Sequence, residues 1–232
     1  MRLSVVIPTL DEAAALPALL EDLRALGEPL CEIVIADAGS SDGTVDLARA
    51  AGARIVPAPR GRARQLNAGA QYSRGDWLLF LHADSRIDTN ACAAIRDALA
   101  VVPPVDAAVF RFAIDLPPVW KRLIEAGQAM RESLFGLAYG DQGLLIRREC
   151  FDAVGGYPEL PLMEDVVMIR RLRRRYGVAR LPASVLTSGR RYRQRGIVRT
   201  WISHTLFITL FAAGVSPARL ARWRDGATAL AR

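Results

Sequence analysis

Short apolar runs alternate with helical patterns along the first eighty residues. The runs are rich in β-branched residues and predict four strands, at residues 3–9 (LSVVIPT), 31–37 (CEIVIAD), 54–58 (RIVPA) and 76–82 (DWLLFLH). Apolar positions at helical spacing between these runs predict three helices, at residues 13–26, 44–52 and 61–73. Strands that are apolar along their whole length are covered on both faces. The alternation therefore predicts an α/β fold with a mostly parallel sheet flanked by helices.

The pattern continues less regularly toward the C-terminus. It predicts further helices at 90–101, 119–138 and 164–177, and strands at 106–114 and within 141–149. The last forty residues predict helix. Thr9 and Glu12 have the spacing of a capping box, which predicts a helix starting directly after the first strand. We expect one catalytic domain over residues 1–188 and a helical C-terminal extension over 189–232, which packs on the domain or docks at a membrane surface.

Polar residues gather where the predicted strands end. The turn from Pro8 to Glu12 follows the first strand, Asp37 ends the second, and Asp84 follows the fourth. In parallel α/β sheets, ligands bind beyond the carboxyl ends of the strands. We therefore expect these acidic positions to share one edge of the sheet.

Composition narrows the class of protein. The 232 residues are 51% hydrophobic and 24% charged, which suits a globular chain with a full core. Three widely spaced cysteines favour neither a disulfide framework nor a zinc site, and the first apolar run is too short for a signal peptide. We expect the protein in the reducing cytoplasm. The inner face of the membrane is one candidate location there.

The net charge of +7 is concentrated in two segments. Residues 170–177 (RRLRRRYG) and 189–199 (GRRYRQRGIVR) are densely basic, which favours anionic partners. The acidic strand ends would repel a nucleic-acid backbone, so we expect no nucleic-acid partner. Residues 200–215 are apolar but short for a membrane span, and a docking helix or a helix packed on the core both explain them.

Two acids at strand ends are candidate ligand residues. Asp84 could hold Mg²⁺ or Mn²⁺ on a diphosphate, because these ions prefer oxygen ligands and often bind through one carboxylate plus phosphates. A turn cap explains Asp84 equally well. Asp37 precedes the small residues AGSSDGT and could accept a hydrogen bond from a nucleoside base, while Ser41 and Asp42 are explained as turn formers.

Two further groups lie at predicted helix starts. Arg62 and Arg64 could attract phosphate together with free backbone amides, or could be solvated. Glu164 and Asp165 point about 100° apart, so one of them could face the site as a base for an acceptor hydroxyl. Favourable interaction with the helix dipole also explains acids at this position.

Six motifs in this order resemble the family 2 glycosyltransferases with the GT-A fold. They are SVVIPTLDE, EIVIADAGSSDGT, GRARQLNAGA, FLHADS, VGGYPE and MEDVVMIRRL. The likeness spans residues 3–177 and is nearest to the bacterial subgroup associated with radical-SAM and selenodomain proteins. The resemblance implies a GT-A (Rossmann-like) fold and an inverting transfer of sugar from a nucleotide diphosphate, UDP by the family's habit, to a hydroxyl acceptor, for which a lipid-linked molecule is one candidate.

The resemblance also implies roles for single residues. Asp84 would bind a divalent metal, Mn²⁺ or Mg²⁺, and Asp165 would be the general base with Glu164 beside it. The positions implied to hold the nucleotide-sugar, including those from the phosphate argument above, are Pro8, Thr9, Glu12, Asp37, Gly39, Arg64, Asn67, Gly69, His82, Ala83, Arg190 and Arg191. Arg190 and Arg191 correspond only loosely to the family's Q-x-x-R-W region.

Two departures from the family pattern concern the donor site. Ala38 stands where relatives often have a second acid, which changes the nucleoside pocket. His82 stands where they have the first acid of D-x-D. Imidazole is a poor ligand for Mg²⁺, so the histidine favours Mn²⁺.

Two alternatives remain from the sequence. One is a nucleotidyltransferase on a related fold, which would need a basic, glycine-rich turn after the first strand, where PTLDE is acidic. The other is a non-catalytic basic protein that binds a membrane surface or a nucleotide through residues 170–199.

Overall fold

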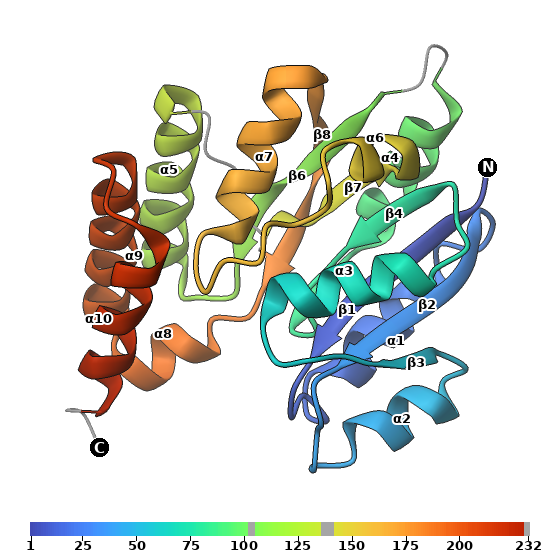
Figure 1. The fold of residues 1–232 in the computed structure, drawn as a ribbon, viewed down its shortest axis with the longest axis horizontal. Coiled ribbons are helices and arrows are strands. Elements are labelled where there is room, and N and C mark those ends of the chain that lie inside the picture. The colour runs from blue at the N-terminus through green and yellow to red at the C-terminus, as the bar shows by residue number, and fades with distance from the viewer. Residues whose placement is uncertain (102–104, 136–141, 230–232) are drawn as a thin grey trace.

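The computed structural model has one eight-stranded mixed sheet flanked by helices (Figure 1). It describes residues 1–101, 105–135 and 142–229. The sheet order is β3-β2-β1-β4-β7-β6-β8-β5. The strands are β1 (Leu3–Thr9), β2 (Leu30–Asp37), β3 (Arg54–Pro57), β4 (Trp77–Phe80), β5 (Ser85–Arg86), β6 (Ala107–Ile114), β7 (Leu144–Arg147) and β8 (Val178–Thr187). The helices are α1 (Leu16–Arg24), α2 (Thr44–Ala50), α3 (Arg62–Tyr72), α4 (Thr89–Ala100), α5 (Pro118–Phe135), α6 (Arg148–Ala153), α7 (Glu164–Arg175), α8 (Arg190–Arg195), α9 (Ile197–Ala212) and α10 (Pro217–Ala229).

Strand directions give the sheet a single carboxyl edge. β1 pairs in parallel with β2 and β4, and β2 pairs in parallel with β3. β7 is antiparallel to both β4 and β6, so β6 runs in the direction of β4. β8 is parallel to β6. The segments that follow β1, β2, β4, β6 and β8 therefore all leave the sheet at the same edge.

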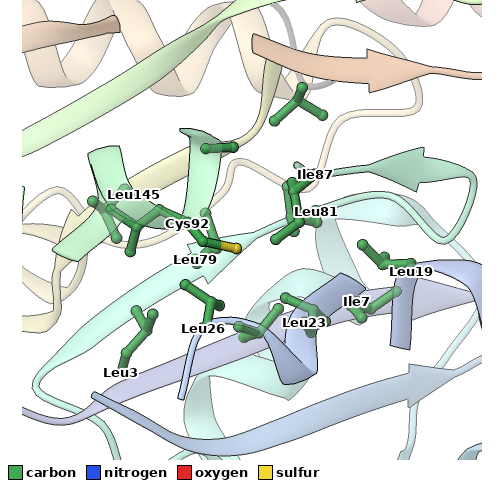
Figure 2. Packing of buried hydrophobic residues seen from close by; sticks show 14 of the residues in the cluster. Leu3, Ile7, Leu19, Leu23, Leu26, Leu79, Leu81, Ile87, Cys92 and Leu145 are labelled. Carbon is green, nitrogen blue, oxygen red and sulfur yellow. The ribbon is translucent and has the colours of Figure 1, made fainter. Parts of the chain in front are cut away.

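Both faces of the sheet are buried, as the apolar strands predict. On β1, Val5 and Ile7 pack into the cluster beneath α1 and α4, while Val6 packs into the cluster beneath α3 and α7. Figure 2 shows the first cluster, where Leu19 and Leu23 of α1 lie over β1 and Leu79 of β4. Alternate side chains of one strand thus feed two cores, and the predicted α/β architecture is confirmed.

One local prediction is wrong, and two elements were not predicted. Helix α1 begins at Leu16 rather than after Glu12, and the Thr9 hydroxyl donates to Asp37 across the sheet instead of capping a helix. Helix α6 at residues 148–153 was not predicted, since only a strand was expected within 141–149. Strand β8 was not predicted at all. The predicted helix 119–138 and strand region 141–149 match α5 and β7, and their remaining residues 136–138 and 141 lie outside the described residues.

The C-terminal helices pack against the body of the protein. Tyr192 of α8 is buried with Ile124 of α5, and Trp201 of α9 packs against the same cluster. Leu220 of α10 is fully buried with Met163 and Val166 at the start of α7. No helix in the described ranges is both long and apolar enough to cross a membrane.

Candidate active site

The carboxyl edge brings together residues from five separate segments. Glu12 follows β1, Asp37 ends β2, and His82 and Asp84 follow β4. Arg190 and Arg191 start α8 directly after β8, while Glu164 and Asp165 start α7. The sequence argument for one shared edge is therefore confirmed for the strand ends, and the unpredicted strand β8 explains why two distant arginines join them.

Asp37 is held by its own turn. One carboxylate oxygen accepts hydrogen bonds from the hydroxyls of Thr9 (2.8 Å) and Ser40 (2.5 Å), and the other accepts from the backbone N–H groups of Gly39 and Ser40 (both 2.9 Å). Burial alone would raise the pKa of Asp37, but these hydrogen bonds outweigh it and lower the pKa below its ordinary value. All four acceptor positions of the carboxylate are used within the protein.

The turns after β1 and β2 are cross-linked to each other. The Asp11 carboxylate accepts from the Ser41 N–H (2.8 Å), and the Asp42 carboxylate accepts from the Ala13 N–H (2.8 Å). Thr44 accepts from the Glu12 N–H (2.9 Å). Asp11 has a φ of 55°, a left-handed conformation that aspartate tolerates better than most residues. These bonds fix the position of Glu12 at the rim of the site.

Glu12 lies between acids and an arginine. Its carboxylate is 3.4 Å from a guanidinium nitrogen of Arg190 and has Asp84 and Asp42 as charged neighbours. Burial raises the pKa of Glu12, and repulsion from Asp84 and Asp42 adds to the rise, although Arg190 opposes it. A divalent cation beside Asp84 would relieve this repulsion.

Asp84 has the chemistry of a metal ligand. It is half-buried, offers hard oxygen atoms, and has Glu12 and Arg191 as charged neighbours. Among the described residues, no group of three or more His, Cys, Asp or Glu side chains could hold a metal ion. The hard oxygen atoms of Asp84 suit an ion such as Mg²⁺ or Mn²⁺ that takes one or two protein carboxylates and completes its shell with substrate phosphates and water.

His82 lies on the side of the site that faces the paired acids. It lines a small hollow together with Arg62 of α3, Tyr157 and both acids at the start of α7. Ala83, the next residue, is buried in the core beneath α1. Ala83 separates His82 from Asp84 in the sequence. The His82 side chain lies beside the two acids of α7.

Glu164 and Asp165 have different surroundings. Glu164 is only 3% exposed, and its carboxylate lies 3.2 Å from Arg62. Burial raises the pKa of Glu164, against the lowering effect of Arg62. Asp165 is half-buried, and one of its oxygens accepts from the Val166 N–H at 2.7 Å. Both acids line the hollow, but the glutamate is buried and committed to an ion pair, whereas the aspartate is only half-buried.

The residue before this acid pair has an unusual backbone. Met163 has a φ of 65°, although its side chain is buried against α10. A non-glycine residue in the left-handed region costs roughly 1–3 kcal/mol and persists where the surroundings enforce it. The packing of Met163 against Leu220 therefore helps to set the direction in which α7 presents its acids.

Three residues of α3 that were expected near the nucleotide are engaged elsewhere. Arg64 forms an exposed ion pair with Glu159 (2.9 Å). Asn67 clamps the backbone of Tyr157, donating to its carbonyl (2.8 Å) and accepting from its N–H (2.9 Å). A Cβ at Gly69 would overlap the Val6 side chain, so the glycine lets α3 approach β1 closely.

Several arginines surround Arg191 and give this part of the site a positive charge. Desolvation lowers the pKa of Arg191, and repulsion from Arg62 and Arg195 lowers it further, while Asp84 opposes the shift. Arg224 of α10 is a charged neighbour of both Arg191 and Glu164. Arg224 was not predicted from the sequence. Its spacing of four residues from Leu220 places both on one face of α10, but no local pattern shows that this face docks on α7.

Gly189 positions the arginine-bearing helix. A Cβ there would overlap the carbonyl oxygen of Asp115, at the end of β6. Arg193 donates to the same carbonyl (2.8 Å) and pairs with the Asp115 carboxylate (3.0 Å). These contacts tie α8 to the carboxyl edge and keep Arg190 and Arg191 over the site.

Comparison with known proteins agrees with this arrangement. Two curated relatives are the PGL/p-HBAD biosynthesis glycosyltransferase of Mycobacterium bovis, 36% identical over 91 residues (36% of each chain), and the succinoglycan biosynthesis protein ExoA of Rhizobium meliloti, 33% identical over 180 residues (67% of this chain and 52% of the relative). The matched part thus spans about a third to a half of these relatives.

Solved structures share the fold at low identity. S. aureus TarS in complex with UDP-GlcNAc has a TM-score of 0.58 at 18% identity, covering 81% of this chain and 58% of that chain. The glucosyl-3-phosphoglycerate synthase of Mycobacterium tuberculosis, in complex with Mn²⁺, UDP and glucosyl-3-phosphoglycerate, has a TM-score of 0.56 at 17% identity, covering 81% and 70%. The sequence model of glycosyl transferase family 2 matches residues 4–153. The chain belongs to glycosyltransferase family 2.

Proposed function

We propose that the protein is a metal-dependent, inverting glycosyltransferase that moves a sugar from a UDP-sugar to a hydroxyl acceptor. The observation that carries this proposal is the meeting of Asp84, the arginines of α8 and the acid pair of α7 at one carboxyl edge. The Mn²⁺ and UDP in the glucosyl-3-phosphoglycerate synthase structure support it by analogy of fold. We also propose membership of the subgroup associated with radical-SAM and selenodomain proteins, on the motifs given above.

In this mechanism each side of the site has one task. Asp84 would hold the metal, which supplies positive charge to the departing diphosphate. Arg190 and Arg191 would bind diphosphate oxygens from the opposite side. Asp165 would accept the proton of the acceptor hydroxyl as its oxygen forms a bond to the anomeric carbon. The bond from that carbon to the diphosphate oxygen breaks on the far face, so UDP leaves and the configuration inverts.

Asp165 is the better base of the pair. Glu164 is buried and paired with Arg62, so it would lose an ion pair on accepting a proton. Asp165 lines the same hollow beside His82 but is half-buried rather than buried. We assign Glu164 the role of positioning Arg62. We assign His82 a contact with the donor, and an imidazole that reached the metal would favour Mn²⁺ over Mg²⁺.

The uridine would occupy the turns after β1 and β2. Pro8, Thr9, Glu12 and Gly39 would line this pocket. Asp37 would mainly hold the turn that lines this pocket, because its four acceptor positions are already used by the turn. Asn67 and Gly69 would support the wall through Tyr157 and Val6. We place the catalytic domain at residues 1–188 and its helical extension at 189–232, at the cytoplasmic side of the cell.

A calorimetric titration of UDP with and without Mn²⁺ tests this proposal. We expect Mn²⁺ to tighten UDP binding at least tenfold in the unaltered protein and to have little effect in Asp84→Asn. Asp97→Asn, which removes an exposed acid of α4, is the matched control and should behave like the unaltered protein. Absence of nucleotide binding would overturn the donor assignment, and UDP binding that ignores the metal would overturn the role of Asp84.

A further inference from the structure

Helices α5 and α9 lie side by side at the margin of the molecule (Figure 1). A Cβ at Gly127 of α5 would lie 3.8 Å from the Trp201 ring of α9. Near the start of both helices, Trp120 and Ile197 pack against the same small cluster. The two helices therefore run in the same direction with their N-terminal ends together.

Each helix exposes a row of large apolar side chains. On α9 the row has a spacing of four residues, and on α5 of four and seven, so each row follows one side of its helix. All six side chains are between 45% and 76% exposed: Val119, Leu123 and Met130 on α5, and Val198, Ile202 and Leu206 on α9. We call these six residues the α5–α9 face.

The two rows lie on the same side of the helix pair. At 100° per residue, the side chains of the α5 row are rotated about the helix axis by roughly 40–80° to one side of the contact residue Gly127. The side chains of the α9 row are rotated by roughly 60–140° in the opposite sense from Trp201. Because the helices run in the same direction, these opposite rotations bring both rows to one surface. The opposite side of α9 is already used, since Phe207, Ile208 and Phe211 pack on the start of α7.

The positive charges beside this face favour an anionic partner. From Ser188 to Arg224 the chain has eight arginines and no acid. Arg122 adjoins Leu123 and Arg199 adjoins Val198, and both arginines are exposed. The acid Glu125 of α5 is directed inward, where it accepts from the Ile114 N–H at 3.0 Å. A second copy of the chain would bring the same positive charge to the interface, whereas an anionic surface would be attracted.

We infer that the α5–α9 face docks on an anionic lipid bilayer. The apolar side chains would enter the boundary between headgroups and acyl chains, and Arg122 and Arg199 would meet lipid phosphates. The helices would lie in the plane of the surface, because their other sides are packed on the protein. This extends the expected docking helix 200–215 to a two-helix surface in which α5 has an equal share.

The location has a consequence for the acceptor that rests on the proposed function. Helix α9 begins two residues after α8, whose Arg190 and Arg191 stand over the site. Docking of the α5–α9 face would hold the site near the bilayer. A lipid-linked hydroxyl would then reach Asp165 without leaving the membrane.

Co-sedimentation of the full chain with vesicles tests the inference. Phosphatidylcholine vesicles with and without 30% phosphatidylglycerol serve as probes, at low salt and at 0.5 M NaCl. We expect sedimentation with the anionic vesicles only, and weaker binding at high salt. The triple variant Val198→Ser, Ile202→Ser, Leu206→Ser should bind at least tenfold less. Leu47→Ser and Tyr72→Ser, which remove apolar side chains exposed elsewhere, should bind normally.

Three results would overturn the inference. The first is an unaltered protein that stays in the supernatant with anionic vesicles at low salt. The second is a triple variant that binds as well as the unaltered protein while its thermal melt is unchanged. The third is a dimer in analytical ultracentrifugation that the triple variant converts to monomer, without any lipid binding. The UDP titration is run on the same samples, so failure of lipid binding is distinguishable from failure of the proposed function.

Discussion

The two adjacent acids at the start of α7 differ in what they can do. Both line the hollow beside His82, but Glu164 is buried and paired with Arg62, while Asp165 is half-buried. We expect Asp165→Asn to lower kcat by about 10²–10⁴-fold, the usual contribution of a general base, and to leave UDP affinity unchanged. Steady-state kinetics and calorimetry measure the two quantities. Full activity in Asp165→Asn would refute the assignment of the base, and Glu164→Gln is the matched comparison, with a smaller loss expected.

Asp37 gives a prediction about stability and pH. In Asp37→Asn, an amide nitrogen would replace an oxygen that accepts from Gly39 and Ser40, which costs roughly 1–3 kcal/mol of unfolding free energy. The pKa of Asp37 is lowered in the fold, so its contribution is present above the ordinary pKa of an aspartate and is lost as the pH falls through the folded pKa. The difference between the two proteins in urea unfolding should be full at pH 7 and shrink below about pH 4.

The control for this prediction is Asp46→Asn. Asp46 is exposed and pairs with Arg49 on its own helix, so its replacement should change stability little at either pH. An Asp37→Asn protein as stable as the unaltered one at pH 7 would contradict the structural role of the four hydrogen bonds.

At the scale of secondary structure, the approach of α3 to β1 depends on one glycine. A Cβ at Gly69 would overlap the fully buried Val6 side chain, so Gly69→Ala should lower the unfolding free energy by about 1–3 kcal/mol. In a Val6→Ala background the same change should cost less, because the obstructing methyl group is gone. Urea denaturation of the four proteins in this cycle measures the coupling. Equal costs in both backgrounds would place the strain elsewhere.

The elements that the sequence predicted well are those with unbroken patterns. β1, β2 and α3 were predicted within one residue of their ends, because each is a contiguous apolar or helical run. β8 escaped because Pro182 lies inside it. The pairing of β6 with β8 is irregular between Val109 and Arg111, opposite this proline, and a proline is tolerated at such a bulge.

Only part of the site could be predicted from the sequence. Strand direction was sufficient to bring Glu12, Asp37 and Asp84 to one edge, since all three follow parallel strands. The engagement of Arg64 with Glu159 and of Asn67 with Tyr157 could not be predicted, because these partners are about ninety residues away along the chain. Arg224 depends on the docking of Leu220, which no local pattern specifies.

At the scale of the whole molecule, the C-terminal extension and the acid pair of α7 share one apolar cluster. Leu220 is fully buried against Met163, whose φ of 65° sets the start of α7. We therefore expect Leu220→Ala to lower the unfolding free energy by about 2–5 kcal/mol, as for other buried leucines. Hydrogen exchange should be slow in both β1 and α9 of the unaltered protein, because one cooperative unit includes both. In Leu220→Ala it should become faster in both together.

Leu206→Ala is the matched control, since Leu206 belongs to the same extension but is exposed, and its effect should stay within about 0.5 kcal/mol. An extension that exchanges freely while β1 stays protected would contradict this coupling. In that case residues 189–232 would form a separately unfolding unit, and Met163 would need another constraint to hold its left-handed backbone. Transfer activity measured on Leu220→Ala below its melting temperature distinguishes these cases, because only the coupled arrangement lowers kcat through misplaced acids while leaving UDP affinity unchanged.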